Sequence, residues 1–266
     1  MSKKYEFTGR TRNWCGTPLL QIRAVKAFAN IREGDIGGWI ETDDNISQED
    51  DAWVGGDAKV FGCAKVRGNA LINGNAQVYG EARVGGNAKV SGEARVHEYA
   101  LVGGDANVLD DTLVCGNAEV SGYALINGGS TIGGYAQVGG NAHVCGNALV
   151  CGNAKVRDYA LINGDSTVGG DAQIGGYAQV GGDAQIGGDA LVLSSDDYVV
   201  FKNCWSSRRM FTFTRSNRMW RVGCFYGTGK ELVAKAYKDS DRSGRCYEAI
   251  VKAMETIAEA LCEQGR

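Results

Sequence analysis

An aliphatic residue recurs at every sixth position of this 266-residue chain, without a break, from Val54 to Val192. Every member of the series is Val or Ile, and a small residue, nearly always Ala, stands two positions before each of them. Side chains two residues apart lie on the same face of a strand, so each pair predicts one short strand with an apolar inner face. A six-residue period does not match the 3.6 residues of an α-helical turn, and the series therefore excludes an amphipathic helix.

A turn is expected between each strand and the next. Pairs such as Gly68-Asn69 and Gly104-Asp105 separate the strands, and Gly, Asn and Asp are the residues that tolerate positive φ and form turns. Three strands, each followed by a turn, close a triangular coil of eighteen residues. The twenty-four aliphatic positions then predict about eight coils, stacked at the β-strand spacing into a rod of about 40 Å. The Val and Ile side chains would fill the interior of this prism, and the Ala side chains would fit its corners.

The repeat resembles that of a known family. Its order is an aliphatic residue, often Gly, two variable residues and then a small residue, which is similar to the hexapeptide repeat of left-handed β-helix proteins. This resemblance covers about half of the chain and implies a mainly β fold built on a left-handed parallel β-helix. The segment Gly34–Val54 resembles the start of bacteriophage and bacterial hexapeptide-repeat proteins, which are related to the hexapeptide acyltransferases. The stretch Arg221–Thr228 resembles the tail domain of phage-encoded members. The resemblance implies a phage or prophage origin and no particular activity.

Segments of different composition flank the repeat. Both ends of a β-helix are open sheet edges, which invite aggregation unless they are covered. We therefore expect residues 1–51 to form an N-terminal cap and residues 52–195 to form the β-helix. Residues 196–266 are expected to form a small C-terminal α+β domain.

The C-terminal segment is expected to contain three strands and two helices. The strands are predicted at residues 198–201, 210–214 and 220–225. Thr228 and Glu231 have the spacing of a capping box, which predicts a helix that ends near Lys238. Apolar residues at helical spacing from Tyr247 to Leu261 predict the second helix.

Stacking the chain at eighteen residues per coil assigns each outward side chain to one of three faces. One face carries leucines and asparagines, namely Leu71, Leu109, Leu125, Leu161, Asn73, Asn127 and Asn163. Leucines on the outside of a prism are unexpected unless something covers them. We therefore predict that this face is the interface of a homo-oligomer, and a trimer is favoured because homotrimers are common in families with this repeat. The alternative is a monomer with scattered exposed leucines, which single apolar side chains on a surface allow.

Two histidines are the candidates for catalysis. Many left-handed β-helix proteins are acyltransferases that use acetyl-CoA or an acyl carrier protein, with a His as the general base. Both histidines of this chain, His97 and His143, fall on outward positions of the repeat. Neither is flanked along the stack by an evident carboxylate, and no extruded loop interrupts the repeat as it does in those enzymes. His143 is the first candidate because it lies on the face with the leucines, yet these features favour a protein that is not an enzyme.

Composition argues against several other functions. The net charge is −3, so the chain has no overall basic field for nucleic acid, and nucleic-acid binding is not expected. No Cys-x-x-C pair occurs, so no metal site is predicted. No apolar run is long enough to span a membrane, and the N-terminus lacks the apolar stretch of a signal peptide. These features predict a cytoplasmic protein, which would lie in the host cell if the chain is phage-encoded.

The leading hypothesis is therefore a non-catalytic, oligomeric scaffold or binding protein of phage type, without a cofactor. Its β-helix would be a stiff spacer, and its terminal domains would contact a protein partner such as a virion component or a host factor, including a host defence component. One alternative is an acyltransferase that moves an acetyl group from acetyl-CoA to a small amine or hydroxyl, with His143 or His97 as the base. The other alternative is a protein that sequesters a small ligand between subunits.

Overall fold

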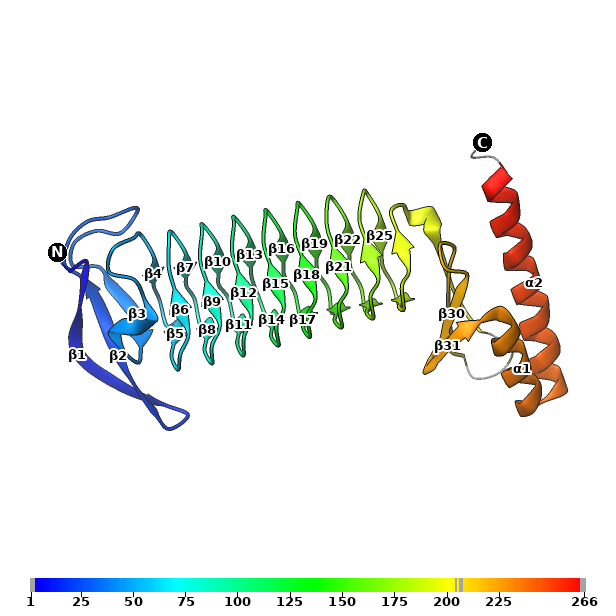
Figure 1. Cartoon of the computed structure of the whole chain (residues 1–266). Helices are drawn as coiled ribbons and strands as arrows, with labels where there is room; N and C mark the ends of the chain where they lie inside the picture. Colours follow the sequence, from blue (N-terminus) through cyan, green and yellow to red (C-terminus); the bar gives the residue numbers. More distant parts are fainter. Residues whose placement is uncertain (1–2, 204, 206–207, 264–266) are drawn as a thin grey trace.

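A long parallel β-solenoid forms the centre of the molecule, with a folded unit at each end (Figure 1). The computed structural model describes residues 3–203, 205 and 208–263. The solenoid has about nine turns. Its strands from β4 to β27 are two residues long, start six residues apart and form three parallel sheets.

The outer sides of these three sheets are named here the leucine face, the aromatic face and the basic face. The leucine face belongs to β4 (Trp53–Val54), β7 (Leu71–Ile72), β10 (Lys89–Val90), β13 (Asn107–Val108), β16 (Leu125–Ile126), β19 (His143–Val144), β22 (Leu161–Ile162) and β25 (Gln179–Val180). The aromatic face belongs to β5 (Lys59–Val60), β8 (Gln77–Val78), β11 (Arg95–Val96), β14 (Leu113–Val114), β17 (Thr131–Ile132), β20 (Leu149–Val150), β23 (Thr167–Val168) and β26 (Gln185–Ile186). The basic face belongs to β6 (Lys65–Val66), β9 (Arg83–Val84), β12 (Leu101–Val102), β15 (Glu119–Val120), β18 (Gln137–Val138), β21 (Lys155–Val156), β24 (Gln173–Ile174) and β27 (Leu191–Val192).

Each strand pairs in parallel with residues eighteen positions away, as Val90 pairs with Ile72 on one side and with Val108 on the other. The Val and Ile side chains of the series are buried, and so are the Ala side chains that precede them. This confirms the solenoid and the apolar interior that the six-residue period predicts. Three hydroxyl residues replace Ala and are buried without losing hydrogen bonds, because each donates to the carbonyl three residues earlier; they are Thr112, Ser130 and Ser166.

Glycines at the corners allow the coils to stack closely. Gly104 has φ of +62°, and a Cβ atom there would lie 2.8 Å from both the N and the O of Gly122 in the next coil. Glu98, Asp110 and Asp158 occupy equivalent corner positions with φ near +60°. Each of these carboxylates accepts a hydrogen bond from a glycine N–H in the next coil, which compensates for the unfavourable backbone conformation.

The two ends of the rod differ in hydrogen-bonding character. Each outward N–H of a coil donates to a carbonyl of the next coil, as the N–H of Lys155 donates to the carbonyl of Ala172 at 2.8 Å. The N-terminal end therefore presents carbonyls without a strand partner, and the C-terminal end presents N–H groups without one. The first end requires donors and the second requires acceptors.

The N-terminal segment supplies those donors and part of a further coil. Strands β1 (Tyr5–Trp14) and β2 (Thr17–Ala24) form an antiparallel hairpin, β2 pairs with β3 (Ile36–Ile40), and β3 pairs in parallel with β5. The ammonium of the buried Lys4 donates to the carbonyls of Asp50 and Ala52, both at 2.6 Å. Burial lowers the pKa of Lys4 to about 8, so it stays charged at neutral pH. Asn45, at the end of a 3₁₀ turn (Asp43–Asn45), donates its amide to two more carbonyls, of Gly62 and Ala64.

The C-terminal segment supplies the acceptors. Hydroxyl oxygens accept from three N–H groups of the last coil, in the pairs Gln179 to Ser195 at 3.2 Å, Gln185 to Thr212 at 3.0 Å and Leu191 to Ser216 at 2.8 Å. Ser195 begins a second 3₁₀ turn (Ser195–Asp197), which leads into the C-terminal domain. Both open edges of the solenoid are thus covered by groups of the matching hydrogen-bonding character.

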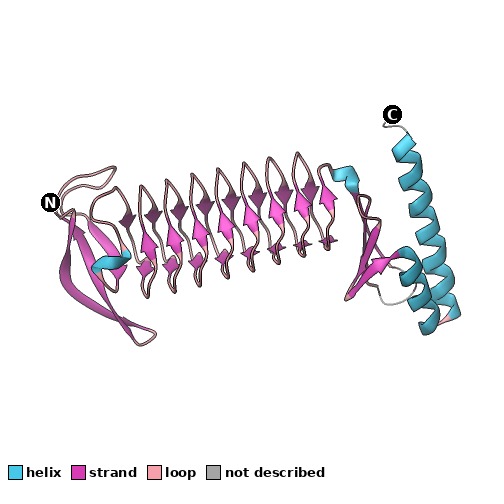
Figure 2. Ribbon diagram, viewed as in Figure 1, coloured by secondary structure: helices cyan, strands magenta, loops and turns pink. Residues whose placement is uncertain are grey.

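The C-terminal domain packs two helices on an antiparallel sheet (Figure 2). Its elements are β28 (Tyr198–Lys202), β29 (Met210–Thr214), β30 (Met219–Val222), β31 (Phe225–Thr228), α1 (Gly229–Asp239) and α2 (Asp241–Glu263). The prediction of three strands is wrong, because residues 220–225 cross a tight turn at Gly223, where φ is +57°, and belong to two strands. The capping box of Thr228 and Glu231 is confirmed at the start of α1.

Within the described part of the chain, neither helix combines the length and the apolar character that a membrane crossing requires.

Candidate functional site on the faces of the solenoid

The leucine face brings together part of the predicted interface. His143 lies in register between Leu125 and Leu161 on neighbouring strands, and Leu109 follows Val108 in the adjoining coil. These side chains are half-buried by their own neighbours. This group on three neighbouring strands and the adjoining coil is called here the leucine patch: Leu109, Leu125, His143 and Leu161.

Of the other predicted interface residues, two lie away from the leucine patch and two lie next to it. Leu71 is separated from Leu125 by Lys89 and Asn107 in the same row, so it lies outside the leucine patch. Asn73 follows Leu71 by two residues and hydrogen-bonds to the N–H of Gly74 at 2.8 Å. Asn127, Cys145 and Asn163 each come directly after a strand of this face, in three successive coils. The remaining two asparagines therefore lie on either side of Cys145, which is two residues after His143.

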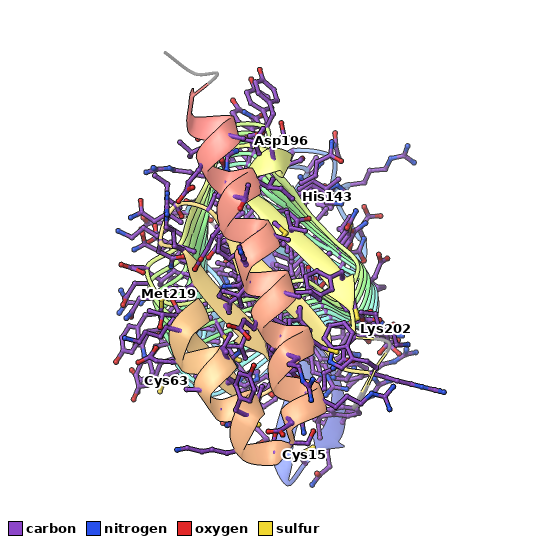
Figure 3. The ribbon with its side chains drawn as sticks, turned by 90° about the vertical axis from the view of Figure 1, so that its right-hand side faces the viewer. Cys15, Cys63, His143, Asp196, Lys202 and Met219 are labelled. Carbon is purple, nitrogen blue, oxygen red and sulfur yellow. The ribbon has the colours of Figure 1, made fainter. Side chains whose placement is uncertain are left out.

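The imidazole of His143 is oriented by an amide. Viewed along the rod, His143 lies on the outside of the triangular cross-section (Figure 3). Its Nε2 lies 2.9 Å from Oδ1 of Asn127. Because a carbonyl oxygen only accepts, Nε2 carries the proton and Nδ1 keeps a free lone pair. Burial lowers the pKa of His143, so the ring is neutral at neutral pH. The ring could accept a proton at Nδ1, but its partner is a neutral amide, which stabilises an imidazolium less than a carboxylate does.

His97 belongs to a stack of rings on the aromatic face. Its ring lies 4.8 Å from that of Tyr79, which lies 5.0 Å from that of Phe61, and both pairs are nearly parallel. Glu98 is nearby, with 3.9 Å between its Oε1 and Nδ1 of His97, but its other oxygen accepts the N–H of Gly116. Burial lowers the pKa of His97 more than this carboxylate raises it. The two histidines lie on different faces and form no joint site.

The cysteines on the faces are not activated. Cys115, Cys145 and Cys151 are half-buried free thiols, and burial raises the pKa of each. A raised pKa keeps the thiol protonated and poorly nucleophilic. Among the residues that the structure describes, no three metal-ligating side chains gather in one place.

A row of tyrosines along one corner is a feature that the sequence interpretation missed. Tyr123, Tyr159 and Tyr177 are 66%, 56% and 76% exposed, and Tyr123 and Tyr159 each lie two residues before a leucine of the leucine patch. The rings of Tyr159 and Tyr177 stack at 5.1 Å. The sequence could have revealed them, because Tyr stands there at a corner position that is usually Asn or Asp in this repeat. Exposed tyrosines beside an apolar patch are typical of protein interfaces.

Comparison with protein-family models finds no match for this chain, and comparison with curated proteins finds none either. A fold by itself does not define an activity, so the outward side chains of the three faces are what indicate function.

Proposed function

We propose that this protein is a non-catalytic scaffold or binding protein of the phage hexapeptide-repeat type, wound left-handed, that assembles as a homotrimer through the leucine face. The observation that carries the proposal is the leucine patch with its adjoining row of exposed tyrosines. Such a surface is costly to leave in water and matches the composition of protein interfaces. The solenoid would hold the two terminal units at a constant separation, because every coil is hydrogen-bonded to the next.

The terminal domains are proposed to contact a protein partner, such as a virion component or a host factor. Helix α2 supports this proposal, because Ile257 and Leu261 remain 47% and 41% exposed on it. They continue the apolar stripe of Ile250 and Met254, which packs against the domain core. The exposed end of the stripe is therefore available for a second protein.

Changing two leucines of the patch is expected to dissociate the assembly. Wild-type protein should have the solution mass of three 28.2 kDa chains, and the double variant Leu125→Glu, Leu161→Glu should have the mass of one. In the trimer six carboxylates, two from each chain, would otherwise be buried at the leucine faces, which costs several kcal/mol. Light scattering coupled to gel filtration measures both masses.

The matched control is Leu149→Glu, a half-buried leucine at the same repeat position on the aromatic face. It should leave the trimer intact, and circular dichroism should be the same for all variants. A monomeric wild-type protein, or a control that dissociates equally, would contradict the proposed interface.

Acid is expected to weaken the assembly through His143. The ordinary pKa of His is about 6.5. Burial lowers that of His143 further, so the ring is neutral above this pH and becomes charged only as the pH falls below it. A charge among the leucines opposes association, so the trimer should dissociate as the pH falls below the ordinary His value and be unaffected between about pH 7 and 8. Sedimentation velocity across this pH range would show the change, His143→Gln should remove it, and His97→Gln should retain it. Equal acid sensitivity in His143→Gln would exclude His143 as its origin.

A binding experiment with acetyl-CoA distinguishes the scaffold hypothesis from the acyltransferase alternative. The oriented Nε2 of His143 is the observation that favours the alternative, since Nδ1 is then free to take a proton. The unbroken register of the coils opposes it. Calorimetric titration with acetyl-CoA is expected to give no binding, whereas tight binding, with turnover lost in His143→Ala, would establish the enzyme.

A further inference from the structure

The basic face has an open depression of about 300 Å³ that the proposed assembly does not use. It lies over β6, β9, β12 and β15, on a different sheet from the leucine patch. Its floor contains Gly85 and Gly103, and its rim is formed by Lys65, Arg67, Arg83, Leu101, Glu119 and Ser121.

The depression exists because two neighbouring outward positions have no side chain. The residues that directly follow strands β6, β9, β12 and β15 are Arg67, Gly85, Gly103 and Ser121, one per coil. A Cβ atom at Gly85 or Gly103 would meet nothing within 4 Å, and neither residue has positive φ. Arg67 and Ser121 close the two ends, three coils or about 14 Å apart. The floor could therefore be filled by a side chain without strain, which provides a direct test of occupancy.

One end of the depression carries more positive than negative side chains. Lys65 and Arg83 are directly paired on neighbouring strands, where like charges repel. Lys65 contacts Asp44, with 3.1 Å from its ammonium to the carbonyl and 3.7 Å to the carboxylate, and Arg67 donates to the same carbonyl at 3.4 Å. Among the described residues, Arg83 has no hydrogen-bond or ion-pair partner. Arg83 is exposed, so its guanidinium is accessible to an anion, which would also relieve the repulsion.

The depression changes in character along its length. Arg83, Leu101 and Glu119 are consecutive in one row, so a cation, an apolar side chain and an anion follow one another on successive coils. Leu101 is 42% exposed and provides an apolar surface beside the two glycines. A complementary ligand carries an anion at one end, a flat apolar body in the middle and a hydrogen-bond donor at the other end.

We propose that this depression binds a nucleoside phosphate whose base carries an amino group, such as adenosine monophosphate. The phosphate accepts hydrogen bonds from Arg83, with Lys65 nearby, because a guanidinium matches the geometry of phosphate oxygens. The base lies over Gly103 and against Leu101, and its amino group donates to Glu119. An extended acidic peptide fits less well, because it would place a second carboxylate against Glu119. The site lies within one chain, so it is independent of the proposed assembly.

Isothermal titration calorimetry of the full chain with adenosine monophosphate tests the proposal. Wild-type protein is expected to bind, and Arg83→Gln and Gly103→Leu should each weaken the affinity by about tenfold or more. The first variant loses a charged hydrogen bond to the phosphate, and the second fills the space that the base would occupy. Lys155→Gln and Gly139→Leu are the controls, since each removes a cation or adds a leucine in the same row of the same face, at a residue that does not line the depression. They should alter the affinity by less than about twofold. Leucine is native to this repeat position at Leu109 and Leu193, so both leucine variants should fold.

Related ligands test each part of the site. Adenosine, inorganic phosphate and inosine monophosphate lack the anion, the base and the amino donor respectively, and each should bind about tenfold more weakly than adenosine monophosphate. The proposal would be overturned by an absence of binding at millimolar adenosine monophosphate or by an undiminished affinity in Gly103→Leu. It would also be overturned if inorganic phosphate or a short polyglutamate peptide bound as tightly as the nucleotide.

Discussion

Replacing Trp220 by alanine is expected to unfold the C-terminal domain while the solenoid remains folded. Trp220 is fully buried and its ring contacts those of Phe201, Phe211 and Phe213, with centroids 4.9 to 6.4 Å apart. Truncation of a buried Trp typically costs about 3–5 kcal/mol, which approaches the whole stability of a small domain. The domain has its own core, separate from that of the solenoid. Hydrogen exchange followed by mass spectrometry should show lost protection in residues 198–263 and retained protection in residues 54–174.

Trp220→Phe is the matched variant for this experiment. The indole Nε1 of Trp220 has no hydrogen-bond partner among the described residues, so phenylalanine loses volume but no hydrogen bond. Its cost should therefore be less than half that of alanine. If the solenoid lost protection together with the C-terminal domain, the two cores would be a single cooperative unit, and the expected independence would be wrong.

Gly104→Ala is expected to destabilise the solenoid by about 3 kcal/mol. The left-handed backbone conformation costs an alanine about 1–2 kcal/mol, and the close approach of the new Cβ to Gly122 adds to it. The adjacent glycine is the control: Gly103 has no positive φ and open space around its Cβ position, so Gly103→Ala should change the stability by less than about 0.5 kcal/mol. Chemical denaturation of both variants measures the difference.

Gly104→Asp is expected to be less harmful than Gly104→Ala, although its side chain is larger. Asp110 and Asp158 show how an acid is accommodated at this position, with the carboxylate accepting the N–H of a glycine in the next coil. Gly122 would provide that N–H for an aspartate at residue 104. If alanine were tolerated better than aspartate, the hydrogen bond to the next coil would not be what permits acids at these corners.

The six-residue period was sufficient to predict the central fold. It identified the inward residues, the eighteen-residue offset between paired strands and the face on which each outward side chain lies, including Leu125 and Leu161 beside His143. This succeeded because every coil repeats the same local conformation, so one coil predicts the next. The same argument failed in residues 220–225, where apolar residues continue on both sides of a turn and the local pattern resembles one strand.

The ends of the rod could not be predicted in this way. The N-terminal partial coil pairs Ile40 with Val60, an offset of twenty residues instead of eighteen, and Asn45 supplies hydrogen bonds that a strand would otherwise make. Lys4 reaches carbonyls more than forty residues away in the chain. These contacts are made by side chains of segments that have no repeat, so the six-residue period could not predict them.

The candidate sites divide in the same manner. The repeat places His143, the leucines and the row Arg83, Leu101, Glu119 on their faces, because an outward position follows from the strand register alone. The hydrogen bond from His143 to Asn127, the contacts of Lys65 and Arg67 with Asp44, and the isolation of Arg83 depend on how side chains of different coils and of the N-terminal segment meet. A repeating backbone is encoded by local preferences, whereas the chemistry of a surface depends on contacts between residues distant in the chain, which only the folded molecule brings together.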